Sequence, residues 1–78
     1  MENYKQLMKT TVNGITMTVR KITVLKVAYY VIDITTPSNG CDLLITKTTR
    51  GETVAYRIAQ RVLSQLTDGV GFWDLKFT

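Results

Sequence analysis

The 78-residue sequence contains no histidine and a single cysteine, Cys41. Without histidine the chain has neither an imidazole base nor an imidazole metal ligand. A single cysteine excludes an intramolecular disulfide, and without a histidine partner nothing activates its thiol, so we interpret Cys41 as an ordinary small residue. The fold must therefore be stabilised by packing, by self-association or by a partner.

The sequence also lacks a long apolar run and a signal-peptide pattern. The longest apolar run, Val27 to Ile32, is far too short to span a bilayer. The start, Met1-Glu2-Asn3, has no basic region followed by an apolar stretch. Together with the scarcity of cysteine, these features predict a cytoplasmic protein that does not act in a membrane.

What is present is the composition of a folded globule, because 45% of the residues are apolar and 21% are charged. The length predicts one domain, residues 1–78, with a small core. The net charge of +4 permits an acidic partner or nucleic acid. It requires neither, because the basic residues are spread along the chain and no basic run is longer than Arg20-Lys21.

The strongest pattern is an amphipathic helix over residues 49–66. Apolar side chains occupy one half of the helical wheel, at Val54, Ala55, Ile58, Ala59, Val62, Leu63 and Leu66. The helix is expected to begin in a capping box, in which the Thr49 hydroxyl accepts a hydrogen bond from the Glu52 amide. It is expected to end at Asp68-Gly69, with Gly69 in the left-handed C-terminal position.

The sequence around Asn13-Gly14 predicts a β-hairpin with a two-residue type I′ turn. The register would pair Val12 with Ile15, Thr10 with Met17 and Met8 with Val19 on one mostly apolar face. Leu7 would oppose Arg20 on the other, mostly polar face. The apolar positions then change from odd to even numbers, which predicts a bend or bulge between residues 20 and 26.

A second hairpin is predicted from residues 27–35, which are rich in β-branched and aromatic side chains, and a returning strand over 41–47. A four-residue loop over 37–40 would pair Ile34 with Leu43 and Ile32 with Ile45. A last strand is predicted over 72–77. The expected fold is α+β, an antiparallel sheet of four to five strands with one amphipathic helix packed on one face, in the order β-β-β-β-α-β.

One short helix can cover only one face of such a sheet, so the other face needs its own explanation. The second hairpin places on it a mixed set of side chains: Val27, Tyr29, Val31, Asp33, Thr35, Asp42, Leu44 and Thr46. Clustered apolar side chains on a surface usually mark an interface. We therefore expect this face to be buried in a homodimer or against a partner protein, with contacts from Val27, Tyr29, Val31 and Leu44. The alternative is that the N-terminal segment with Tyr4 folds back and covers it.

Three other features each have a functional and a plainer interpretation. Asp33 and Asp42 would suit a hard cation such as magnesium if they lay diagonally, but no third ligand is evident. Arg57 and Arg61, one helical turn apart, form either a solvated helix surface or a ridge that faces anions. Tyr29 is either buried or placed to stack a base, although no segment resembles the aromatic motif of the RNA-recognition fold.

These observations favour a non-enzymatic binding module that modulates or inhibits a partner protein by occluding its surface. No catalytic residue, cofactor site or metal site is predicted. The alternative is a nucleic-acid-binding protein that uses the basic helix face with Arg57 and Arg61, and a structural homo-oligomer is a third hypothesis. The small, basic, threonine-rich composition is typical of phage and mobile-element accessory proteins.

Overall fold

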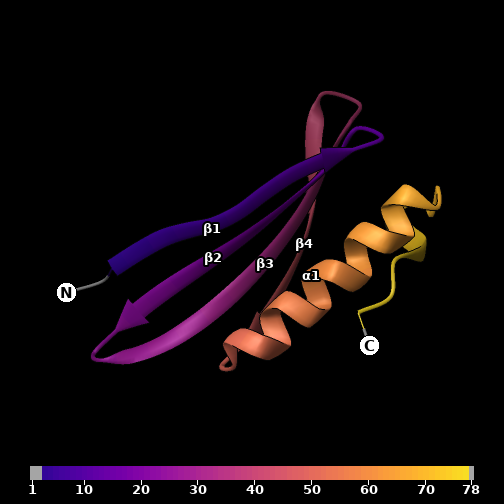
Figure 1. Ribbon diagram of the computed structural model, residues 1–78. Coiled ribbons are helices and arrows are strands. Elements are labelled where there is room, and N and C mark those ends of the chain that lie inside the picture. The colour runs from indigo at the N-terminus through magenta and orange to yellow at the C-terminus, as the bar shows by residue number, and fades with distance from the viewer. Residues whose placement is uncertain (1–2, 78) are drawn as a thin grey trace.

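In a computed structural model that describes residues 3–77, a four-stranded antiparallel sheet is followed by one α-helix. The elements are β1 (Asn3–Val12), β2 (Ile15–Val24), β3 (Val27–Ser38), β4 (Cys41–Thr49), α1 (Glu52–Thr67) and the short 3₁₀ helix η1 (Phe72–Asp74). The strands lie in the order β1-β2-β3-β4, and α1 crosses one face of the sheet (Figure 1). This confirms the predicted α+β class. Residues 1, 2 and 78 lie outside the described part. Met1 and Glu2, from which the sequence predicts that no signal peptide is present, are therefore not described.

The core lies between α1 and the sheet face that we call the inner face. Apolar side chains from the two central strands meet the helix there: Ile15, Met17, Val19, Tyr30, Ile32 and Ile34 from the sheet, and Ala55, Ala59, Val62 and Leu66 from α1. The small side chains of Ala55 and Ala59 let the helix approach the sheet closely. Burial of this apolar surface is the main stabilising contribution. We call the opposite sheet face the outer face.

The first hairpin follows the predicted register near its turn and departs from it at Leu7. The pairs of Val12 with Ile15, Thr10 with Met17 and Met8 with Val19 are confirmed. The pairing of Leu7 with Arg20 is wrong, because the register shifts between Gln6 and Met8 and Gln6 opposes Arg20. Leu7 is therefore the extra residue of a β-bulge, and its side chain packs against the core instead of lying on the outer face.

The bend or bulge that was expected between residues 20 and 26 is a tight turn at Leu25-Lys26. β2 continues to Val24, which pairs with Val27, so Leu25 and Lys26 alone connect β2 to β3. Both have left-handed backbone angles, with φ of 51° and 66°. A two-residue turn of this kind is normally built from Asn-Gly, as it is at Asn13-Gly14. The apolar positions change to even numbers because Ile22 and Val24 lie on the outer face.

The second hairpin also uses a two-residue turn, at Asn39-Gly40, in place of the predicted loop over 37–40. Ile34 consequently opposes Ile45 and not Leu43. Pro37 belongs to β3 and is tolerated there because β3 extends beyond the end of its pairing with β2. The register error is two residues, and side chains alternate with a period of two, so each predicted residue still lies on its predicted face.

The C-terminal end of α1 matches the prediction and the N-terminal end does not. Gly69 has a left-handed φ of 87°, and the Val70 amide donates to the Gln65 carbonyl at 3.0 Å, as in a Schellman motif. The residue before the first turn is Gly51, without a side-chain cap, because Thr49 is still paired within the sheet. Among residues 3–77, no helix has the length and hydropathy of a membrane span.

The predicted strand over 72–77 is wrong, because the chain after α1 forms η1 and then an extended segment without a sheet partner among the described residues. Phe72 and Leu75 are buried in the core, three residues apart, which is the spacing of side chains that align on a 3₁₀ turn. The Gln65 side-chain amide donates to the Lys76 carbonyl at 2.6 Å and accepts from the Lys76 amide at 2.8 Å. A helix side chain thus satisfies backbone groups that a neighbouring strand would otherwise pair.

Side chains of the sheet contact both ends of α1. At the C-terminal end, the Asn13 side-chain amide donates to the Leu66 carbonyl at 3.0 Å. At the N-terminal end, the Tyr30 hydroxyl lies 3.4 Å from a Glu52 carboxylate oxygen, a long contact. The Asn13-Gly14 turn therefore both closes the first hairpin and helps to fix the helix on the inner face.

Candidate interaction surface

The outer face carries no covering element within residues 3–77, because α1 and the segment after it pack on the inner side (Figure 1). Near the β2–β3 turn, Tyr4, Ile22 and Tyr29 are paired in one row across three strands. The next row pairs Val24 with Val27. We call these five residues the outer patch. Tyr4 is 57% exposed and the other four are partly buried.

Arginine side chains lie over both tyrosine rings of the outer patch. The Arg20 guanidinium is 5.6 Å from the centre of the Tyr4 ring, and the Arg50 guanidinium is 5.0 Å from the centre of the Tyr29 ring. Contacts of this kind contribute roughly 0.5–1 kcal/mol at exposed sites. The patch therefore presents aromatic surface with cations at its edge.

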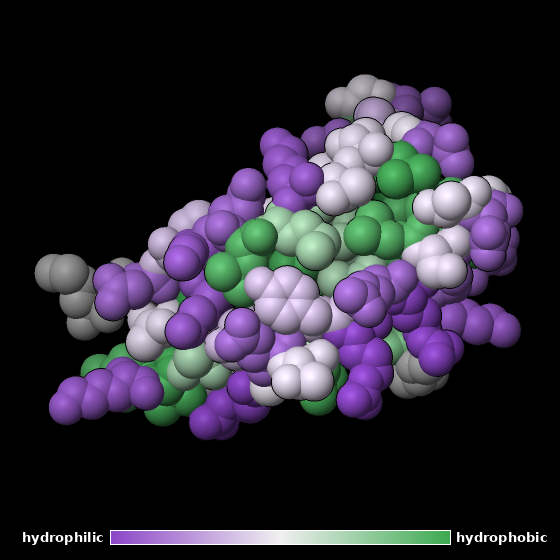
Figure 2. All heavy atoms as spheres, viewed as in Figure 1, coloured by the Kyte–Doolittle hydropathy of each residue, from purple (hydrophilic) through white to green (hydrophobic). Residues whose placement is uncertain are grey.

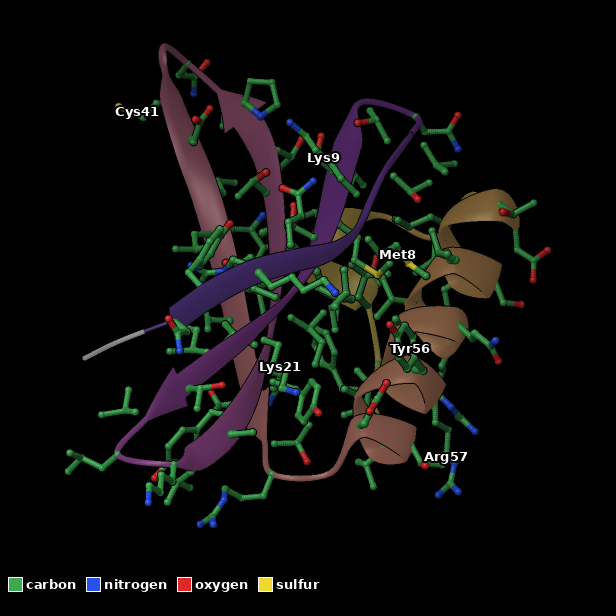
Figure 3. The ribbon with its side chains drawn as sticks, turned by 60° about the vertical axis from the view of Figure 1, so that its left-hand side comes forward. Met8, Lys9, Lys21, Cys41, Tyr56 and Arg57 are labelled. Atoms are coloured by element: carbon green, nitrogen blue, oxygen red, sulfur yellow. The ribbon has the colours of Figure 1, made fainter. Side chains whose placement is uncertain are left out.

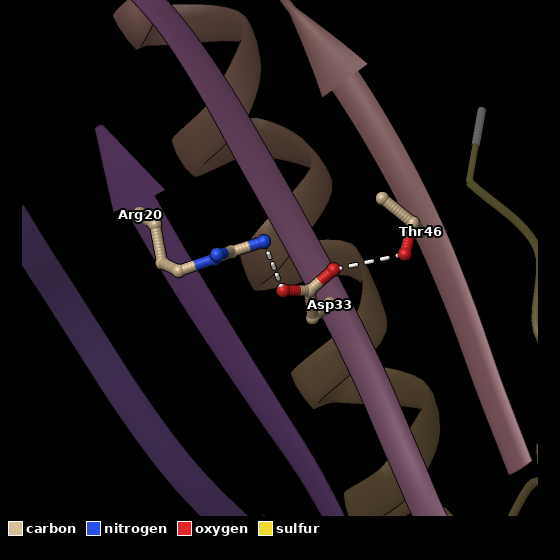
Figure 4. A network of polar contacts seen from close by, with 3 residues as sticks. All are labelled: Arg20, Asp33 and Thr46. Carbon is tan, nitrogen blue, oxygen red and sulfur yellow. Dashed lines mark hydrogen bonds and ion pairs between the residues drawn. The ribbon is translucent and has the colours of Figure 1, made fainter. Parts of the chain in front are cut away.

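A polar network holds Arg20 in place on this face (Figure 4). The Arg20 Nη2 atom forms a 2.6 Å ion pair with Asp33 Oδ2, and the Thr46 hydroxyl donates to Asp33 Oδ1 at 2.9 Å. Both carboxylate oxygens of Asp33 therefore already bind side chains of the neighbouring strands. Asp42 opposes Pro37, four residues along β4 from Thr46, so the two aspartates do not form a cation site. Among residues 3–77, no three metal-ligating side chains come together.

The structure brings together only part of the predicted contact set. Val27 and Tyr29 both belong to the outer patch. Val31 lies on the same face but is only 7% exposed, between Arg20 and Thr48, and it supports the face from within. Leu44 is 60% exposed, but it opposes Thr35, six residues along β3 from Tyr29. At about 3.3 Å per residue, Leu44 is about 20 Å from the patch.

Sequence reasoning missed Ile22 and Val24 in the outer patch and Leu25 beside it, and it offered Tyr4 only as an alternative cover for this face. The change of parity at Ile22 and Val24 is the available signal, and it predicts only a bend or bulge. Tyr4 reaches this face only because the bulge at Leu7 shifts the pairing by one residue, which turns Tyr4 from the inner face to the outer face. Leu25, in the adjoining turn, is 82% exposed, the highest value among the large apolar side chains.

The predicted Arg57 and Arg61 lie on the solvent side of α1, away from the outer patch. Figure 3 shows Arg57 extending from the helix away from the sheet. Both arginines line an open groove of about 580 Å³ together with Gln60, Ser64, Gln65 and Lys76. We call these six residues the basic groove. The structure therefore does not bring Arg57 and Arg61 together with Val27 and Tyr29, and the molecule has two separate candidate surfaces.

Apolar side chains also reach the surface between β1 and α1, where Figure 2 shows a hydrophobic band flanked by polar residues. Met8 extends from β1 toward the helix and Tyr56 extends from the helix toward the sheet (Figure 3). Leu7 and Met8 are partly buried there and belong to the core. This band is the margin of the core, where the helix covers the edge strand incompletely.

Comparison with known proteins gives no match, because no protein-family model, no curated protein and no solved structure is significantly similar to the chain. The fold alone does not define a function, since one fold hosts many activities. The function therefore has to be argued from the two surfaces described above.

Proposed function

We propose that this protein is a non-enzymatic binding module that modulates a partner protein by covering part of its surface, and that the outer patch makes the contact. The patch joins two tyrosines to three aliphatic side chains on the helix-free face. Aromatic and arginine side chains are the types most enriched in binding hot spots. The molecule measures 38 by 27 Å along its two longer axes, which is compatible with the roughly 800 Å² per partner of a standard interface.

One observation carries this proposal, the composition of the turn beside the patch. The three strand connections are all two-residue turns with left-handed backbone, and two of them use Asn-Gly. The third uses Leu25-Lys26, where each residue costs roughly 1–2 kcal/mol in this conformation. Leu25 is 82% exposed, so the chain gains almost no burial from it. Departures of this kind from local rules are expected at functional sites, and here a partner provides the missing burial.

The charges around the patch favour a different protein over a second copy of this chain. Arg50 and Lys26 flank the patch, and Asp33 is already paired with Arg20. A second copy docked on the same surface would bring the same excess of positive charge to the interface. A partner with acidic groups around an apolar centre would complement it, and homodimerisation is the alternative that experiment can exclude.

Replacing Leu25-Lys26 by Asn-Gly tests the proposal without endangering the fold. The double variant Leu25→Asn, Lys26→Gly relieves part of the left-handed strain, and the greater conformational entropy that glycine loses on folding offsets part of the gain, so we expect the free energy of unfolding to rise by about 1 kcal/mol. It also removes an exposed apolar anchor, so affinity for the partner captured from the native cell should fall at least about 30-fold, which corresponds to about 2 kcal/mol. Urea denaturation and titration calorimetry provide the two readouts.

The control is Asn39→Asp, at the turn on the far end of the sheet, which changes a solvated turn residue without altering the patch. Its affinity for the partner should match that of the unaltered chain. Unchanged affinity of the Leu25→Asn, Lys26→Gly variant would mean that this turn does not contact the partner. The composition of the turn would then no longer support the proposed function. A dimer in sedimentation that dissociates in this variant would favour the homodimer instead.

A further inference from the structure

The second surface combines positive charge with an apolar hollow. Beside the basic groove, a hollow of about 310 Å³ is lined by Val54, Ile58 and Phe77, and it shares Arg57 and Arg61 with the groove. Among the described residues, neither lining includes an aspartate or a glutamate. A surface of this kind complements a ligand that carries negative charge next to a flat or apolar group.

Segments that are far apart in the sequence build this surface. The Gln65 amide fixes Lys76 beside the helix through its two hydrogen bonds to the Lys76 backbone. The Lys47 ammonium, from β4, lies 5.0 Å from the centre of the Phe77 ring. Cations from α1 line the hollow, Lys76 of the C-terminal segment lines the adjoining groove, and Lys47 of β4 lies over the Phe77 ring. A helix surface that only faces solvent does not require cations from three segments to lie close together.

We infer that the basic groove and its neighbouring hollow bind single-stranded nucleic acid. Phosphates lie along Arg57, Arg61 and Lys76, because guanidinium groups bind phosphate oxygens through paired hydrogen bonds. One base packs against the partly exposed Phe77 ring in the hollow, since an aromatic platform accepts any base. The combination of a cationic track with an aromatic ring favours this ligand over an acidic peptide, which needs no ring. This inference is independent of the outer patch.

The test measures binding of a fluorescein-labelled oligo(dT) of about 20 nucleotides by fluorescence anisotropy over a series of salt concentrations. The double variant Arg57→Gln, Lys76→Gln removes two phosphate contacts. For single strands each contact contributes about 0.7 to the slope of log affinity against log salt, so the slope should fall by about 1.4. At 0.1 M salt this corresponds to a loss of affinity of about 25-fold.

The matched control is Lys5→Gln, Lys9→Gln on the edge strand β1, which removes the same net charge far from the groove. Its affinity and salt slope should stay close to those of the unaltered chain. A third variant, Phe77→Leu, keeps all charges and should weaken oligo(dT) binding by about tenfold with the salt slope unchanged. The Leu25→Asn, Lys26→Gly variant should bind oligo(dT) normally, which separates this site from the outer patch.

Four results would overturn the inference. The first is equal loss of affinity in the groove variant and the β1 control, which would mean that net charge alone attracts the oligonucleotide. The second is no binding of oligo(dT) by the unaltered chain at 0.1 M salt, and the third is equal binding by the Phe77→Leu variant. The fourth is displacement of oligo(dT) by poly-glutamate at lower concentration than by unlabelled oligo(dT), which would assign the groove to an acidic protein. Circular dichroism of each variant verifies that it is folded.

Discussion

Replacing Phe72 by alanine is expected to lower the free energy of unfolding by about 3–5 kcal/mol. Phe72 is 7% exposed and belongs to the core, although it lies after α1 in a segment outside the sheet. A 78-residue chain has a total stability of about 4–12 kcal/mol at roughly 0.05–0.15 kcal/mol per residue. The expected loss is therefore a large part of the total stability, and the urea midpoint followed by circular dichroism should fall markedly.

The neighbouring Trp73 gives a matched control, because its larger ring is 75% exposed and meets Phe72 only edge to face, at 5.1 Å between ring centres. Trp73→Ala should cost no more than about 1 kcal/mol. If the C-terminal segment were a strand with Trp73 facing inward, Trp73→Ala would lower the free energy of unfolding more than Phe72→Ala. A larger loss for Trp73→Ala than for Phe72→Ala would therefore contradict the observed packing.

Replacing Leu66 by alanine is expected to cost about 2–5 kcal/mol through a cavity at the C-terminal end of α1. Leu66 is fully buried, and its carbonyl accepts the hydrogen bond from Asn13 that fixes this end of the helix. Surrounding side chains cannot collapse into the cavity without disturbing that contact, which favours the upper part of the range. The free energy of unfolding from urea denaturation measures the effect.

Val54 lies on the same helix and provides the comparison, since it is 41% exposed. Val54→Ala should change stability by no more than about 0.5 kcal/mol, as expected for a surface substitution, partly because alanine is the better helix former. Similar losses for Val54→Ala and Leu66→Ala would mean that α1 does not present its Leu66 side to the sheet.

The parts of the fold that were predicted correctly depend on local chemistry. Asn13-Gly14 specified both the turn and the register of the first hairpin, because few other dipeptides adopt two successive left-handed conformations easily. Gly69 ended α1 for the same reason. The helix itself followed from apolar spacing over four turns, which is long enough to distinguish it from a strand.

Several errors arose where tertiary packing decides between local alternatives. Thr49 matches a helix cap, but the pairing of β4 with β3 extends far enough to keep it in the sheet. Residues 72–77 alternate like a strand, yet the space beside α1 accepts Phe72 and Leu75, which the 3₁₀ turn brings to one side. Leu25-Lys26 carries no turn signal at all, because a turn built from these residues is unfavourable by itself.

The candidate site was predictable only in its β3 part. Val27 and Tyr29 follow from alternation along β3, a property of that segment alone. Tyr4 required knowledge of the bulge at Leu7, and the separation of Leu44 from Tyr29 required the register between strands. Long-range pairing of this kind depends on how the strands pack together, which a single sequence without a marked turn does not specify.

The central claim is that the outer patch is the docking surface, and affinity capture with three versions of the chain tests it most directly. The baits are the unaltered chain, the double variant Val27→Lys, Tyr29→Lys, and the variant Leu44→Lys, which adds a lysine on the same face about 20 Å away. We expect all three to fold by circular dichroism, and the partner to be captured by the first and third baits but lost from the second. Capture of the same partner in equal amount by the Val27→Lys, Tyr29→Lys bait would contradict the claim.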